Sequence, residues 1–156
     1  MSVTSPREQH LNDLGYQLPQ APAPAAIYQP YMQSGLDLWV AGQIAVSDGT
    51  LIHEGRVGVS VNLEQAQACA LQCALNLLAQ VKAASGSLEQ IKRVLKLNVF
   101  VASDPSFTQQ HLVANAASEL FGRVLGVDGV HARSAVGVSV LPLNSPVEID
   151  AVFELK

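Results

Sequence analysis

Residues 62–86 carry the clearest signal of local structure in this chain, a long amphipathic helix rich in alanine and leucine. Asn62 is a preferred N-cap residue, Gln65 completes a capping box with it, and Gly86 is suited to end the helix. Apolar residues recur along the segment with the helical period, and many of its side chains are small. We therefore expect much of this helix to be covered, at close range, by a sheet.

Alternating apolar residues predict strands before and after this helix. In the segment 36–44, Leu36, Leu38, Val40 and Ile44 are expected to share one face. The expected strands are 28–34, 36–44, 91–101, 134–140 and 147–155, with a short strand at 51–52 after the turn Asp48-Gly49.

Two further helices are expected. Residues 6–15 form a short one, which precedes a Pro/Ala-rich connector at 18–26. A longer one begins with Asp104 as N-cap and Pro105 at the first helical position. The order strands, helix, strand, helix, strands predicts an α+β fold, a mixed sheet with two helices packed on one face. We interpret residues 1–156 as one domain, in which 1–21 form an N-terminal helix and lead-in.

Composition restricts the function classes. Charged residues make up 14% of the chain, well below the usual quarter. Either part of the surface is hidden in an oligomer, or Gln, Asn and Ser cover it. The net charge is −4 and no run of Lys or Arg exists, which disfavours a nucleic-acid partner. No segment predicts a membrane span or a secretion signal, so a cytoplasmic protein is expected.

Metal and cofactor motifs are missing from the sequence. Cys69 and Cys73 lie four residues apart in the long helix and are expected in the core, and the four histidines are scattered. No phosphate-binding or dinucleotide-binding glycine motif is present. We therefore expect no metal and no organic cofactor.

Two charged residues with apolar neighbours are candidates for chemistry. Arg133 opens a strand and can bind a carboxylate through two parallel hydrogen bonds. Glu148 can orient or deprotonate a water molecule. The alternative for both is a solvated outer strand face. If 133–141 and 147–155 form a simple hairpin, Arg133 and Glu148 lie roughly 23 Å apart at about 3.3 Å per residue. A shared site then requires residues from two subunits.

These segments resemble the Rid/YjgF family, also called endoribonuclease L-PSP-like, and in particular a longer branch of it. The resemblance covers about residues 22 to 156. It rests on the order and spacing of Ala41-Gly42-Gln43-Ile44, the helix 62–78, the strand 94–101, Ala132-Arg133-Ser134-Ala135-Val136, Leu141-Pro142 and Val147-Glu148-Ile149-Asp150-Ala151.

The resemblance implies a chorismate-mutase-like fold and a homotrimer with three clefts between subunits. It also implies hydrolysis of 2-imino or 2-enamino acids to 2-oxo acids and ammonia, without metal or cofactor. In this reading Arg133 binds the substrate carboxylate and Glu148 positions the attacking water. Asn115 lines the cleft, Tyr31 or Tyr28 closes it, and backbone at Gly42 and Ala135 supplies further hydrogen bonds.

Two departures from the family pattern keep other functions open. Ala41 stands where the deaminases commonly carry Ser, and Ala135 stands where many carry Cys or Thr. The loss of these polar groups suits a second hypothesis, a trimer that binds a small carboxylate or another metabolite without turnover. A ribonuclease is a third hypothesis, which the acidic balance disfavours. A purely structural oligomer is a fourth.

Overall fold

The computed structural model describes residues 4–156, so residues 1–3 of the predicted N-terminal segment lie outside the described part. Its helices are α1 (Pro6–Asp13), α2 (Leu63–Ser85) and α3 (Gln110–Leu125). Its strands are β1 (Tyr31–Ser34), β2 (Asp37–Ile44), β3 (Val46–Ser47), β4 (Thr50–Leu51), β5 (Ile91–Ala102), β6 (Ala132–Val138) and β7 (Val147–Leu155). Short 3₁₀ turns are η1 (Leu88–Gln90), η2 (Gly126–Gly129) and η3 (Pro142–Asn144).

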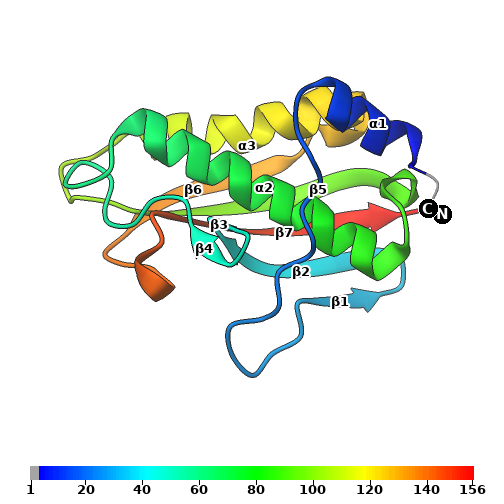
Figure 1. The fold of residues 1–156 in the computed structure, drawn as a ribbon, viewed down its shortest axis with the longest axis horizontal. Helices are drawn as coiled ribbons and strands as arrows, with labels where there is room; N and C mark the ends of the chain where they lie inside the picture. The colour runs from blue at the N-terminus through cyan, green and yellow to red at the C-terminus, as the bar shows by residue number, and fades with distance from the viewer. Residues whose placement is uncertain (1–3) are drawn as a thin grey trace.

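The main sheet has five strands in the order β1-β2-β7-β5-β6. Its neighbouring strands are antiparallel, except that β5 and β6 are parallel. Helices α2 and α3 lie side by side across one face of this sheet (Figure 1). The predicted α+β class, a mixed sheet with two helices on one face, is confirmed. The hairpin β3–β4 turns at Asp48-Gly49, as predicted, with positive φ at both residues.

Helix α2 forms as its sequence predicts. The Asn62 side chain accepts a hydrogen bond from the Gln65 amide at 2.8 Å, and the Gln65 side chain accepts one from the Asn62 amide at 3.0 Å. Gly86 ends the helix with a φ of 86°. Cys69 and Cys73 are fully buried. The core beneath α2 and α3 is built from buried apolar residues of β2, β5 and β7, among them Leu38, Val40, Leu97, Val99, Ile149 and Phe153.

The predicted start of the second long helix is wrong. Helix α3 begins at Gln110, and its N-cap residue Gln109 makes no side-chain capping bond. Asp104 instead accepts a hydrogen bond from the Ser106 amide at 3.0 Å, and the Asp104 carbonyl accepts one from the Phe107 amide at 2.9 Å. An Asp side chain stabilises such a local turn as readily as a helix start. Asp104 therefore stabilises a turn here and does not cap a helix.

A bulge changes the face on which part of β2 lies. The register against β7 shifts between Val40 and Gln43, which inserts one extra residue. Gln43 therefore joins Leu38 and Val40 on the helix-covered face, where it is 6% exposed. The prediction that Ile44 shares this face is wrong, as is the prediction for Leu36, which lies before β2 and is exposed. The first predicted strand, 28–34, is shorter and starts at Tyr31.

The predicted hairpin between residues 133–141 and 147–155 is also wrong. Strand β6 pairs in parallel with β5, and β7 lies between β2 and β5. The reason is that α3 connects β5 to β6 as a crossover, which returns the chain in the same direction. Strand β6 is consequently the edge of the sheet, and it shares no hydrogen bonds with β7.

The other face of the sheet is bare. Within residues 4–156 no helix lies on it (Figure 1). Large apolar side chains stand exposed on this face, with Met32 at 63%, Trp39 at 57% and Val136 at 46% exposure. Separately, no helix of the described residues is long and apolar enough to cross a membrane.

We expect Gly122→Ala to stabilise the fold. Gly122 is exposed within α3, and a Cβ added there meets nothing within 4 Å. Alanine loses less conformational entropy than glycine in a helix, so the free energy of unfolding should rise by about 0.5–1 kcal/mol. Thermal and urea unfolding measure this change. An unchanged or lower melting temperature would contradict the described environment of α3.

Candidate functional site

Arg133 lies at the start of the edge strand β6, on the helix-covered side of the sheet. Its Nη1 donates to Asn115 Oδ1 at 3.0 Å and to Ser118 Oγ at 3.0 Å, both on α3. Its Nη2 donates to the His111 carbonyl at 3.3 Å. No ion pair involves Arg133 among residues 4–156. Its charge is therefore oriented by neutral groups and is available to an anion.

A histidine extends this network. His131 Nδ1 lies 2.6 Å from the Gly129 carbonyl, which can only accept, so Nδ1 carries the hydrogen. In the neutral ring Nε2 then accepts a hydrogen bond from the Ser118 hydroxyl, at 2.9 Å. Burial lowers the pKa of His131, the Gly129 carbonyl opposes this shift, and the charge of Arg133 lowers the pKa further. Neither His131 nor Ser118 was predicted for the site, although His131 lies two residues before Arg133 and Ser118 is one helical turn from Asn115.

Glu148 lies on the bare face of the sheet. It alternates along β7 with the buried residues Val147 and Ile149, and it is paired with Ile44 and Phe100 on the neighbouring strands. Its carboxyl group packs over Gly42, where an added Cβ would lie 2.8 Å from Glu148 Cδ. Burial raises the pKa of Glu148 above its ordinary value, and repulsion from Asp150 raises it further.

Arg133 and Glu148 do not meet within one chain. Arg133 is level with Leu97 and Glu148 with Phe100, two strands apart, so their Cα atoms are roughly 14 Å apart from standard sheet spacings. Their side chains also leave opposite faces of the sheet. The separation predicted from a hairpin of residues 133–141 and 147–155 rested on the wrong strand pairing. The prediction that Arg133 and Glu148 do not meet within one chain is nevertheless correct, because of the sheet order and the opposite faces.

A cavity of about 560 Å³ lies beside Gly42, Gln43 and Ile44 at the end of β2. The connector after α1, Gly42, the β3–β4 turn and α2 surround it. Gln80 Nε2 crosses to the Pro22 carbonyl at 2.7 Å and so attaches the connector to α2. Asp48 is the single charged residue among those lining the cavity. Gly42 thus lines this cavity and also lies against the Glu148 carboxyl group.

The remaining predicted residues divide between the two places. Ala135 is two residues after Arg133 on the same strand face and packs partly buried against the core. Tyr28 lines the cavity together with Gly42. Tyr31 begins β1 and packs partly buried against the core. The structure therefore forms one group from Arg133, Asn115 and Ala135, and a second from Gly42, Glu148 and Tyr28. Tyr31 belongs to neither group.

The cysteines are removed from both groups. Cys69 and Cys73 are buried in α2, and burial raises the pKa of Cys69 to about 12. Such thiols stay protonated and are poor nucleophiles. Among residues 4–156, no three His, Cys, Asp or Glu side chains come together in a way that could bind a metal ion.

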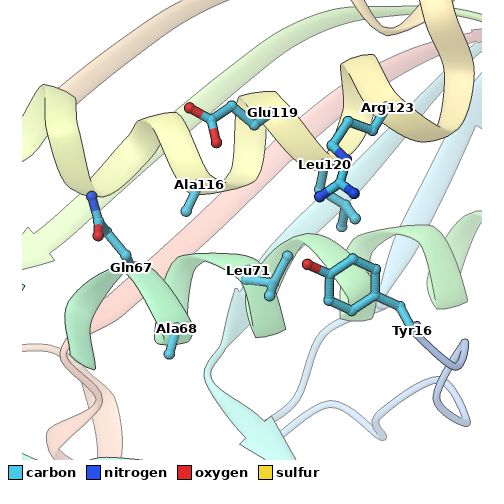
Figure 2. A pocket seen from close by; sticks show the side chains of 8 residues that line it. All are labelled: Tyr16, Gln67, Ala68, Leu71, Ala116, Glu119, Leu120 and Arg123. Atoms are coloured by element: carbon cyan, nitrogen blue, oxygen red, sulfur yellow. The ribbon is translucent and has the colours of Figure 1, made fainter. Parts of the chain in front are cut away.

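A smaller cavity of about 210 Å³ lies between α2 and α3, with Tyr16 across one end (Figure 2). Its charged residues are Glu119 and Arg123, one helical turn apart on α3. None of the residues predicted for the site lines this cavity. We therefore do not place the candidate site there.

The fold and these two groups define a class of small α+β proteins with one helix-covered sheet face and one bare face. A family model described as "YjgF/chorismate_mutase-like, putative endoribonuclease" matches residues 8–155. The chain belongs to this family.

Known relatives cover nearly the whole chain. It is 48% identical over 147 residues to Protein TCP17 of Trypanosoma cruzi, which covers 94% of this chain and 92% of that protein. The crystal structure of Atu1372, a protein with unknown function from Agrobacterium tumefaciens, superposes with a TM-score of 0.89 at 49% identity, over 96% of this chain and 91% of that one. The structure of RidA from an Antarctic Psychrobacter has a TM-score of 0.62 at 28% identity, over 88% of this chain and 99% of that one.

Proposed function

We propose that this protein hydrolyses reactive 2-imino or 2-enamino acids to 2-oxo acids and ammonia, in clefts between subunits of a homotrimer. One observation carries the proposal: Arg133 has no anionic partner among residues 4–156, and neutral groups on α3 fix its orientation. A guanidinium prepared in this way is suited to bind a carboxylate. The similarity to RidA supports the same reading.

The proposed assembly brings the two groups together. Arg133 lies at the sheet edge of one subunit, and Glu148 and Gly42 lie on the bare face of the next. Burial of the exposed side chains Met32, Trp39 and Val136 favours association through that face. The low charge content agrees with such burial. A protein that is a monomer by sedimentation at assay concentration would contradict this part of the proposal.

The reaction needs few groups. Arg133 binds the carboxylate of the imino acid, and Glu148 takes a proton from a water molecule that attacks the imine carbon. Glu148 returns this proton to the imine nitrogen, which gives a carbinolamine. The hydroxyl proton of the carbinolamine then passes to the amino group as the C–N bond breaks, and the products are a 2-oxo acid and ammonia. A raised pKa brings Glu148 closer to the operating pH of a general base. Since the imine carbon is already electrophilic, orientation supplies much of the acceleration.

The direct test is release of ammonia and 2-oxo acid from 2-iminopropionate and 2-iminobutyrate, generated by an amino-acid oxidase. We expect the protein to accelerate release over the buffer rate. Binding of 2-oxo acids without acceleration would establish the alternative, a non-catalytic carboxylate-binding trimer, which the apolar Ala41 and Ala135 suit. Absence of both binding and acceleration would sink the proposal.

In the Glu148→Gln variant, activity and stability are expected to change in opposite directions. We expect turnover to fall by about 10²–10⁴-fold, the usual contribution of a general base. Because the folded state raises the pKa of Glu148, the ionised carboxylate destabilises the fold once the pH rises above the ordinary glutamate value. The variant should therefore melt at a higher temperature than the wild type at pH 7, but not at pH 4. Unchanged turnover at pH 7 would remove Glu148 from the mechanism.

A further inference from the structure

We infer that His131 is a positioning residue that fixes the Arg133 guanidinium through the Ser118 hydroxyl, and that protonation of His131 releases it. The contacts form one directed chain. Gly129 orients His131 at 2.6 Å, His131 Nε2 accepts from Ser118 at 2.9 Å, and Ser118 Oγ accepts from Arg133 at 3.0 Å. While the His131 ring is neutral, the donor and the acceptor of each of these hydrogen bonds are fixed.

The surroundings of His131 favour the neutral ring. The groups that face it are Arg133 at the start of β6, Ser118 and Phe121 on α3, and the Gly129 carbonyl in η2. Phe121 packs edge-on against the ring, with 6.1 Å between the ring centroids. None of these groups is a carboxylate that would stabilise an imidazolium, and one is a cation.

Protonation reverses the chain. A charged His131 has a hydrogen on Nε2 and must donate to Ser118, so Ser118 turns its own hydrogen elsewhere. Ser118 Oγ must then accept from two neighbouring cations, which repel each other. Arg133 keeps its contacts to Asn115 and His111, but this repulsion weakens its contact with Ser118. Acidification should therefore loosen the guanidinium before it unfolds the protein.

The test combines single and double variants in the full-length protein. The first readout is the Kd of 2-oxobutanoate, which rests on the proposed function. We expect Ser118→Ala and His131→Leu each to weaken binding about 3–10-fold, the effect of losing one hydrogen bond. The double variant should be no weaker than either single one, because both changes break the same link. His131→Gln, which keeps an acceptor, should bind within about 3-fold of wild type by the same reasoning.

The pH profile and a control complete the design. Wild-type affinity should fall as the pH drops below the ordinary histidine pKa, and His131→Gln should abolish that fall. His10→Gln changes an exposed histidine on α1 and should keep the wild-type profile. Additive losses in the double variant, or a pH profile unchanged in His131→Gln, would overturn the inference.

A second readout does not depend on the proposed function. The ¹⁵N resonances of the Arg133 guanidinium report restricted rotation without any ligand. We expect distinct Nη signals in the wild type and in His131→Gln, and averaged signals in Ser118→Ala and His131→Leu. If the wild type binds no 2-oxo acid, the proposed function fails, and these resonances still decide the role of His131. Distinct Nη signals in all four proteins would refute it.

Discussion

Arg133→Ala is expected to reduce kcat/KM for imino acids by about 10²–10³-fold, because the carboxylate loses two charge-assisted hydrogen bonds. Arg133→Lys should recover only part of this loss. Lysine supplies a point charge but lacks the planar fork that contacts Asn115, Ser118 and a carboxylate at once. Release of ammonia and 2-oxo acid by the two variants, measured beside the wild type, checks this expectation.

The fold should tolerate both changes. Asn115 and Ser118 are only partly buried, so water can replace the lost guanidinium. We expect melting temperatures close to the wild-type value and an unchanged oligomeric state. A variant that unfolds would instead show that Arg133 attaches β6 to α3. Equal activity of Arg133→Lys and the wild type would contradict recognition of the carboxylate by two hydrogen bonds from the planar guanidinium.

Gly42→Ala is the second change from which we expect a large effect, a loss of activity on the order of 10²-fold. The added Cβ would lie 2.8 Å from Glu148 Cδ and 2.9 Å from its Oε1, so the carboxyl group must move. The φ of Gly42 lies outside the positive region, so alanine fits the backbone and only Glu148 is displaced. Steady-state kinetics should show a lower kcat with little change in KM, because in the proposed mechanism Arg133 still binds the carboxylate.

Gly122→Ala is the matched control for this variant. It adds the same methyl group where no atom lies within 4 Å, and should leave activity unchanged. A Gly42→Ala protein as active as the wild type would mean that the position of Glu148 is not critical. Equal losses in both variants would indicate a general effect of the glycine replacements.

Periodicity and capping residues were enough to predict the fold class. Helix α2 and strands β5 and β7 agree with the sequence within one residue at either end. The predictions were wrong where one residue can stabilise two different local structures, and where the structure depends on contacts between segments far apart in the sequence. Asp104 can cap a helix or a turn, and nothing nearby chooses between them. The order of strands in the sheet depends on packing between distant segments, which alternation does not report.

The candidate site was predictable in part. Arg133 and Glu148 were predicted from their apolar sequence surroundings and Asn115 from the family resemblance, and the structure places Arg133 and Asn115 in contact. Ser118 belongs to no motif, and nothing in the sequence distinguishes His131 from any other histidine next to a strand. Only the folded chain shows that one hydroxyl lies between the ring and the guanidinium. Whether these residues form one site with Glu148 stays a prediction.

The position of β7 has a consequence for how the protein is made. Strand β7 is the last in the sequence, yet it pairs with both β2 and β5, which do not pair with each other. A chain emerging from the ribosome therefore carries two separate partial sheets until this strand arrives. Sheet closure must follow release of residues 147–155, and the exposed strand edges before then are liable to aggregate.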